Sequence, residues 1–205
     1  VAESFGIKIN TFTHILEGYK VATKMAKHGA GGGSFSDWWA YKYEVIDAIP
    51  YNGPILSEAG VLVAYNSDNA EMIRRLNQEA AKAVKYGGLS EEEAWKYVTL
   101  NPAKLLRIDD KVGSIAIGKH ADLVIWSHNP LSIYAVAEKT IIEGAIFYDY
   151  SKLDKKIEQN EKEREIIITQ LKEAKKGGAK TQPAPVIDKR YFECETIDIV
   201  NENVQ

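Results

Sequence analysis

The feature that most constrains the fold is an alternation of strand-like and helix-like segments between Gly6 and Lys104. Residues 61–65 form a short apolar run rich in β-forming residues, which is typical of a strand covered on both faces. Residues 69–86 follow with the spacing of an amphipathic helix that ends at Gly87-Gly88. Strands that alternate with helices indicate βα units around a parallel sheet or barrel, and we therefore expect an α/β fold.

The other segments of the first hundred residues fit this alternation. Ser90 is followed by three glutamates and forms a capping box that opens another helix. The run GAGGGS lacks the lysine of a P-loop and the third glycine of the dinucleotide pattern, so we interpret it as a flexible turn with close backbone packing. We expect strands over residues 7–13, 32–36 and 61–67, and further helices over residues 17–27, 53–60 and 90–98.

The pattern then changes to β-strands and afterwards to a charged helix. Short strands are predicted over residues 112–115, 121–126 and 139–148, the last broken by a tight turn at Glu143-Gly144. Residues 152–176 are dominated by Lys, Glu, Gln and Arg with sparse apolar points, which predicts a solvated helix with a narrow apolar stripe. A proline-containing linker follows, and an acidic tail contains one further predicted strand over residues 195–200.

Composition excludes several classes of function. With 45% hydrophobic and 27% charged residues, the chain is typical of a soluble globular protein. A net charge of -3 gives no electrostatic basis for binding nucleic acid or an anionic membrane. The single cysteine, Cys194, excludes an internal disulfide and a cysteine metal cluster but does not fix the compartment. No apolar run approaches the roughly 18 residues of a membrane span. The N-terminal residues resemble the end of a helix, so we expect the chain to be a fragment.

Two polar side chains stand where predicted strands end. His14 follows the strand over residues 7–13, and Asp68 follows the strand over residues 61–67. The carboxyl ends of barrel strands meet at the face that holds active sites, and imidazole and carboxylate are ligands that zinc prefers. The pair therefore predicts part of a metal site, although a catalytic zinc usually has three protein ligands. Taken alone, Asp68 is also explained as the cap of the next helix, with Glu71 reaching back.

Further polar and aromatic residues surround these two positions. Asn66 and Ser67 would orient Asp68 or contact substrate. The aromatic segment after the strand over residues 32–36 places Asp37 and Trp38 near the same face, where substrate contact and aromatic core packing are equally good interpretations. The remaining histidines are expected to lie in loops or turns without a catalytic role: His28, His120 and His128.

Three segments of the sequence carry motifs of a known family: THILEGYKVA, VAYNSDNAE and TLNPAKLLRIDDKVGSIAIGKHADLVIWSHNPL. In this order they resemble the sixth barrel strand with a metal-binding histidine, the eighth barrel strand with an aspartate and the C-terminal signature of the amidohydrolase superfamily. The resemblance covers about residues 5–149 and is to the C-terminal part of that superfamily. The most similar subgroup is imidazolonepropionase-like. The resemblance implies the C-terminal part of a (β/α)8 TIM barrel, strands 6–8, over residues 1–106, and strands of a small β-sandwich over residues 107–150, in which Asp122 is structural. A charged helix over residues 151–178 and a tail over residues 179–205 lie outside it.

The resemblance also implies a reaction and a partner. The family's metal site is completed by a His-x-His pair on the first strand, a lysine or acidic residue on the fourth and a histidine on the fifth, which this sequence lacks. We therefore expect the N-terminal half of the same amidohydrolase as partner, in a separate chain or a missing segment, and an oligomer. The implied function is hydrolysis of an amide or cyclic amide C–N bond of a small-molecule substrate. One or two divalent ions, zinc by preference, would be held by His14 and Asp68, with Asp68 also moving the proton. The alternative is a non-catalytic scaffold or assembly subunit with the same fold.

Overall fold

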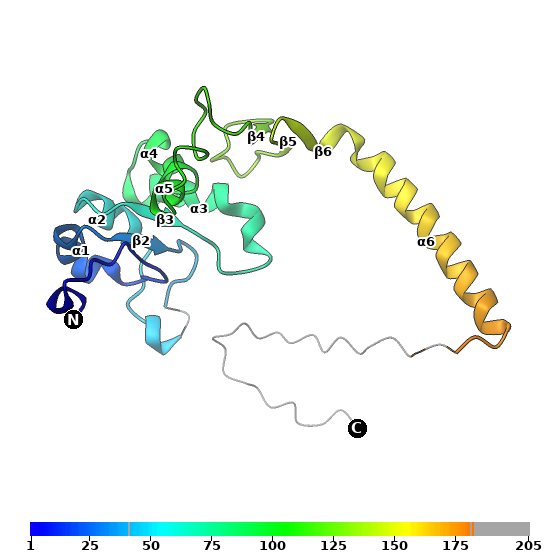
Figure 1. Cartoon of the computed structure of the whole chain (residues 1–205), viewed down its shortest axis with the longest axis horizontal. Coiled ribbons are helices and arrows are strands. Elements are labelled where there is room, and N and C mark those ends of the chain that lie inside the picture. Colours follow the sequence, from blue (N-terminus) through cyan, green and yellow to red (C-terminus); the bar gives the residue numbers. More distant parts are fainter. Residues whose placement is uncertain (41, 181, 183–205) are drawn as a thin grey trace. The chain divides into compact units, whose positions relative to one another are not determined.

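The computed structural model describes residues 1–40, 42–180 and 182. Residues 1–150 form one compact unit, and the long helix α6 belongs to a second (Figure 1). The first unit contains a parallel sheet of three strands in the order β1 (Thr11–Phe12), β2 (Gly31–Ser34) and β3 (Val63–Tyr65). Helices connect the strands, so the α/β fold expected from the alternation is confirmed.

The helices of the first unit match most of the predicted segments. The predicted helix over residues 69–86 is divided, because a 3-10 turn at Met72–Arg75 precedes α3. Ser90 Oγ accepts the N–H of Glu93 at 3.2 Å, which confirms Ser90 as the predicted N-cap, while the Glu93 carboxylate pairs with Lys96. The α-helices are α1 (Ala22–His28), α2 (Asn52–Glu58), α3 (Leu76–Gly87), α4 (Glu91–Lys96) and α5 (Leu100–Leu105), and the other 3-10 turns are Ala2–Phe5, Gly18–Val21, Tyr43–Val45 and Tyr150–Lys152.

The three consecutive glycines of GAGGGS form β2 and are fully enclosed. The expectation of a flexible turn is therefore wrong for Gly31–Gly33, while the strand predicted over residues 32–36 is confirmed as far as Ser34 and close backbone packing is confirmed at Gly31. A Cβ atom on Gly31 would overlap the side chain of Leu105 and lie 3.0 Å from the carbonyl oxygen of Leu62. At this position a glycine is required, because neighbouring segments approach the backbone too closely for a side chain.

The core behind the sheet joins the strands to the helices. Leu56 and Val63 are completely buried, and the rings of Tyr65 and Tyr97 meet edge to face with centroids 4.9 Å apart. Tyr97 also caps the outer edge of β3, because its carbonyl oxygen accepts the N–H of Tyr65 at 2.8 Å. Asn101 Nδ2 donates to the carbonyl oxygen of Val63, likewise at 2.8 Å. Two backbone groups on this edge of the sheet are thus already satisfied.

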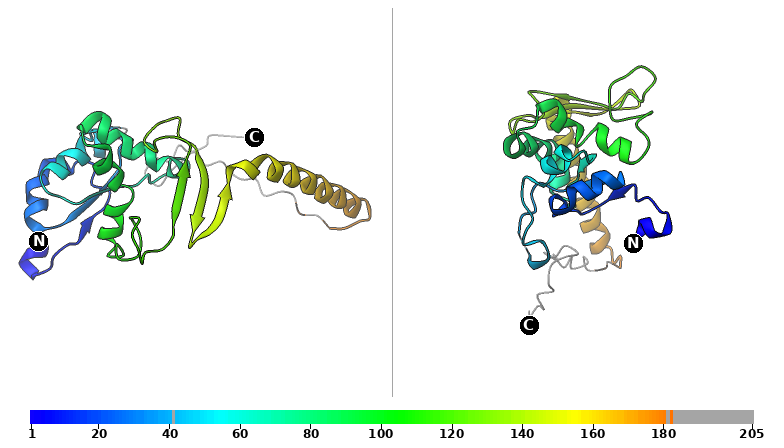
Figure 2. Two further views of the ribbon diagram at one scale, coloured as in Figure 1. Left: turned by 90° about the horizontal axis from the view of Figure 1, so that it is seen from above. Right: turned by 90° about the vertical axis from the view of Figure 1, so that its left-hand side faces the viewer.

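The second sheet of this unit is antiparallel and consists of β4 (Leu123–Trp126), β5 (Ala137–Ile142) and β6 (Ala145–Asp149), which lie side by side in Figure 2. Glu143 and Gly144 form the predicted tight turn with φ angles of 49° and 82°, the left-handed values of a type I′ hairpin. The strand predicted over residues 112–115 is wrong. Lys119 holds this segment in a loop instead, since its ammonium lies 2.7 Å from Ser114 Oγ and 3.4 Å from the carbonyl of Val112.

The charged segment forms α6 (Leu153–Lys176), a helix of 24 residues of which none is buried. The predicted solvated helix is therefore confirmed, and its apolar side chains, such as Ile166 and Leu171, are exposed. Among the described residues, no helix combines the length and apolar character required to cross a membrane. The strand predicted over residues 195–200 lies outside the described residues.

Candidate metal centre

The two residues expected to bind a metal lie next to each other. His14 follows β1 and Asp68 follows β3, so parallel strands separated by β2 deliver them to the same edge of the sheet. His14 Nε2 and Asp68 Oδ2 are 3.3 Å apart. An imidazole nitrogen and a carboxylate oxygen at this separation can share a cation between them or form an ion pair.

The backbone at both residues adopts a conformation that is unusual for residues other than glycine. The φ angles are 54° at His14 and 50° at Asp68. Left-handed conformations of this kind cost on the order of 1 kcal/mol each and are concentrated at functional sites. The chain turns sharply after each strand, and the two turns bring the side chains of His14 and Asp68 together.

The pair remains open to solvent, with side-chain exposures of 48% for His14 and 38% for Asp68. An ion pair this exposed contributes at most about 1 kcal/mol to folding, so stability does not account for the arrangement. The His14 ring stands edge-on to Phe35, with ring centroids 5.1 Å apart, and Phe35 is buried. Within the described part of the chain, no group of three or more His, Cys, Asp or Glu side chains could hold a metal ion. A metal site that used this pair would therefore need further ligands.

The cap of the following helical segment is Asn69 rather than Asp68. Asn69 Oδ1 accepts the N–H groups of Glu71 and Met72, at 2.8 and 3.0 Å. The expected capping role of Asp68 is therefore wrong by one residue, and the Asp68 carboxylate faces His14 instead. Ser67 is buried, and its hydroxyl donates to the carbonyl of Asn69 at 3.3 Å, which stabilises the turn that carries Asp68. Asn66 extends the pairing of β3, since its N–H donates to the carbonyl of Ser34 at 3.0 Å.

The aromatic loop after β2 reaches the same place. Trp38 Nε1 donates to the carbonyl oxygen of Ser67 at 3.0 Å, and the Trp38 ring packs against a small buried cluster that includes Phe35. Trp38 therefore packs against the core and also lies close to the candidate site. Asp37 forms an ion pair with Lys82, so its carboxylate is directed toward α3. Contact of either residue with substrate stays a prediction.

Sequence reasoning missed two buried polar residues that support this edge of the sheet. Asn52 is 2% exposed and bonds the segment after His14: it accepts the N–H of Tyr19 at 2.8 Å and donates to the carbonyl of Ile15 at 2.7 Å and to Ser34 Oγ at 2.8 Å. Glu79 is also 2% exposed and binds Ser36 after β2. For Glu79 a signal existed, because a carboxylate on the apolar face of a predicted helix requires a buried partner.

The other polar residues considered have structural partners. His28 Nε2 accepts the N–H of Ile9 at 2.9 Å, and its Nδ1 lies 2.7 Å from a carboxylate oxygen of Glu3. Asp122 accepts the N–H of Glu143 at 2.8 Å and so supports the hairpin, as expected for a structural residue. His128 Nδ1 lies 2.9 Å from Ser127 Oγ.

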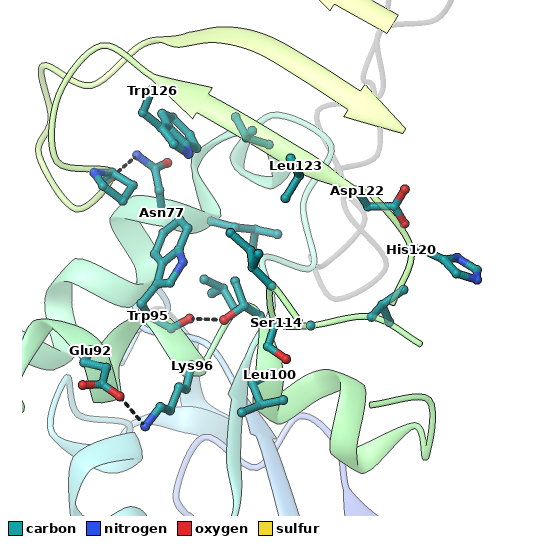
Figure 3. A pocket seen from close by; sticks show the side chains of 18 of the residues that line it. Asn77, Glu92, Trp95, Lys96, Leu100, Ser114, His120, Asp122, Leu123 and Trp126 are labelled. Atoms are coloured by element: carbon teal, nitrogen blue, oxygen red, sulfur yellow. Dashed lines mark hydrogen bonds and ion pairs between the residues drawn. The ribbon is translucent and has the colours of Figure 1, made fainter. Parts of the chain in front are cut away.

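A separate cavity of about 850 Å³ lies between α3, α4 and β4 (Figure 3). Its lining is largely apolar, and Trp95 and Trp126 meet edge to face there with centroids 6.4 Å apart. Figure 3 shows His120 and Asp122 at one end of the cavity, directed away from the apolar side chains. Neither His14 nor Asp68 lines this cavity, so it is distinct from the candidate metal centre.

Comparison with known proteins gives a consistent result. A model of the amidohydrolase family matches residues 53–172. Amidohydrolase tasK of Hapsidospora irregularis is 34% identical over 116 residues, which are 56% of this chain and 12% of that protein. Imidazolonepropionase of Shewanella baltica OS185 is 55% identical over 38 residues, 18% of this chain and 9% of that protein. The crystal structure of an amidohydrolase from Thermotoga maritima MSB8 has a TM-score of 0.66 and 32% identity, covering 72% of this chain and 39% of that one. The chain spans less than half the length of each.

Proposed function

This chain belongs to the amidohydrolase family, and we propose that it supplies part of the active site of a metal-dependent hydrolase that cleaves an amide or cyclic amide C–N bond of a small molecule. The observation that carries the proposal is the pairing of His14 and Asp68 at 3.3 Å, both in strained backbone conformations and both open to solvent. The parallel order of β1, β2 and β3 supports their assignment as strands 6–8 of a barrel.

The residues present fit a divalent metal ion. His14 and Asp68 offer one nitrogen and one carboxylate ligand, a set that suits zinc, and members of this family generally use divalent metals. When bound, such an ion lowers the pKa of a water molecule toward neutrality and polarises the carbonyl of the substrate. Asp68 would take up the proton of the attacking water and return it to the leaving nitrogen. His14 would hold its ligand position through the edge-on contact with Phe35.

The remaining metal ligands would come from the N-terminal half of the same amidohydrolase, as another chain or another part of a longer protein. Exposed apolar side chains support this proposal, among them Phe12 of β1 and Phe147 of β6, which is 71% exposed. We propose an obligate interface on the order of 2,000 Å² or more.

The test uses the protein at its natural length and measures zinc per chain by elemental analysis, after loosely bound metal has been removed. His14→Ala should lower bound zinc, whereas the control His128→Ala should not, because His128 is exposed and its Nδ1 lies against the hydroxyl of the neighbouring Ser127, away from Asp68. Equal zinc content in both variants would refute the role of His14 as a ligand.

A non-catalytic scaffold is the second candidate function. The incomplete ligand set and the exposed helix α6 favour it, since two ligands alone do not make a catalytic zinc site and α6 carries none of the candidate site residues. The scaffold would be supported if the natural-length protein carries no zinc and if no polypeptide with further strand-end histidines is found in its preparations. Stoichiometric zinc would exclude it.

A further inference from the structure

Helix α3 carries a buried carboxylate that binds the loop after β2. Glu79 and Ser36 are 2% and 1% exposed. The N–H of Ser36 donates to Glu79 Oε2 at 2.8 Å, and the Ser36 hydroxyl lies 2.5 Å from the same oxygen. One carboxylate oxygen therefore holds both the main chain and the side chain of Ser36.

Lys82 extends this contact along the loop. Its ammonium lies 3.2 Å from Glu79 Oε1 and also pairs with the carboxylate of Asp37. Burial raises the pKa of the Glu79 carboxyl, which the hydrogen bonds from Ser36 oppose, and it lowers the pKa of Lys82 to about 8. Desolvation therefore costs free energy at both residues, and a pair of apolar side chains at these positions would make the folded protein at least as stable. What the charged pair adds is a fixed geometry for residues 36–37.

The loop held in this way contacts His14 and the residue before Asp68. Phe35, immediately before Ser36, supports the ring of His14. Trp38, immediately after Asp37, donates its indole N–H to the carbonyl of Ser67, the residue before Asp68. A displacement of the loop would therefore move the supports of His14 and Asp68 together.

We propose that Glu79 and Lys82 are positioning residues of the candidate metal centre, which fix the loop after β2 and, through Phe35 and Trp38, set the separation of His14 and Asp68. This role rests on the proposed function, because positioning matters only where the two side chains share a ligand. Groups that orient metal ligands from behind typically alter metal affinity by about 10–100-fold when they are removed.

The experiment compares four variants of the natural-length protein: Glu79→Met, Glu79→Gln, Lys82→Met and Lys85→Met. Methionine keeps the volume near that of the original side chain and removes its charge and hydrogen bonds. Glutamine keeps an oxygen that can accept the N–H of Ser36 and serves as the rescue. Lys85 lies on the same helix, is exposed and contacts the ring of Tyr86, so Lys85→Met is the matched control.

Two measurements are made on each variant. The first is the ¹⁹F signal of Trp38 in protein labelled with 5-fluorotryptophan and freed of metal, assigned with Trp38→Phe. The second is the dissociation constant for Zn²⁺, measured by competition with a chelator. Glu79→Met and Lys82→Met should shift the Trp38 signal and weaken zinc binding about tenfold or more, and Glu79→Gln should restore most of both. Lys85→Met should change neither.

The outcomes separate the two proposals. Wild-type protein that binds no Zn²⁺ overturns the proposed function. Wild-type protein that binds Zn²⁺, with unchanged affinity in both Glu79→Met and Lys82→Met, overturns the positioning role alone. If Glu79→Met does not fold, Lys82→Met against Lys85→Met still decides the matter, because these two variants remove the same group from the same helix.

Discussion

Asn52→Ala should be among the most destabilising substitutions of a polar residue in this chain. Asn52 begins α2, is 2% exposed and makes three hydrogen bonds, to the N–H of Tyr19, the carbonyl of Ile15 and Ser34 Oγ. Alanine removes all three and leaves a backbone donor and a backbone acceptor without these partners. An unsatisfied buried group costs about 1–3 kcal/mol. Because water can reach Tyr19 and Ile15 in part, we expect a loss of about 2–4 kcal/mol in the free energy of unfolding.

The assay is urea unfolding of the natural-length protein, with amide hydrogen exchange at Tyr19 as a local measurement. Asn129→Ala is the control: Asn129 is exposed and also makes two hydrogen bonds, to Glu91 at 2.7 Å and from the N–H of Leu131 at 2.9 Å. Exposed substitutions of this kind usually change stability by about 0.5 kcal/mol or less. The reasoning is refuted if the free energies of unfolding of the two variants differ by less than about 1 kcal/mol and the Tyr19 amide exchanges at its original rate in Asn52→Ala. The buried hydrogen bonds of Asn52 would then not stabilise the fold.

Three further predictions follow from single contacts. Asp68→Asn should abolish turnover in the complete protein while the fold is kept, because Asn69 and not Asp68 caps the next helical segment; activity within about tenfold of wild type would contradict the role of Asp68 as base. Gly31→Ala should lower the free energy of unfolding by about 1–3 kcal/mol, because its Cβ would overlap Leu105, and a midpoint in urea equal to that of wild type would exclude this close packing. Burial lowers the pKa of Lys82 from 10.5 to about 8, so between these two pH values the unfolded chain binds more protons than the folded one. The free energy of unfolding relative to Lys82→Met should therefore rise from pH 8 to pH 10 by on the order of 1 kcal/mol in urea titrations. A difference that is constant with pH would refute the lowered pKa.

The pairing of His14 with Asp68 could be predicted because it depends on local signals only. Each residue follows a recognisable strand, and the carboxyl ends of parallel strands meet at one edge of their sheet. The cap was misplaced by one residue, from Asn69 to Asp68, because either side chain can accept the same N–H groups and sequence does not fix the first helical residue that closely. For the site as a whole, the sequence shows which ligand types are present. The residues that support those side chains come from distant parts of the chain, so the sequence does not reveal them.

Glu79 and Gly31 illustrate what sequence could not provide. The bond between Glu79 and Ser36 joins residues 43 positions apart, and no local pattern specifies that contact. The glycines of β2 favour a turn by propensity, yet they form a buried strand, and at Gly31 the side chain of Leu105 and the backbone of Leu62 leave no room for a Cβ atom. Tertiary packing overrides the local preference in both cases.

The two edges of the parallel sheet are not equivalent, and this difference bears on how a complete barrel would be assembled. On the β3 side, Asn101 and Tyr97 already bond the outward-facing carbonyl of Val63 and N–H of Tyr65. A strand added there would have to replace both bonds, or pair only beyond these residues. On the β1 side, the N–H of Gly31 bonds the carbonyl of Asn10, so the alternation of a parallel ladder turns the backbone groups of Thr11 outward. The exposed apolar side chain of Phe12 lies on the same strand. Under the proposed function, a closed barrel needs a neighbouring strand at both edges, and the β1 edge can accept one without replacing the two bonds described for β3. Thr11→Pro, which removes an outward N–H from that edge, should therefore weaken binding of the partner segment more than Asn101→Ala does.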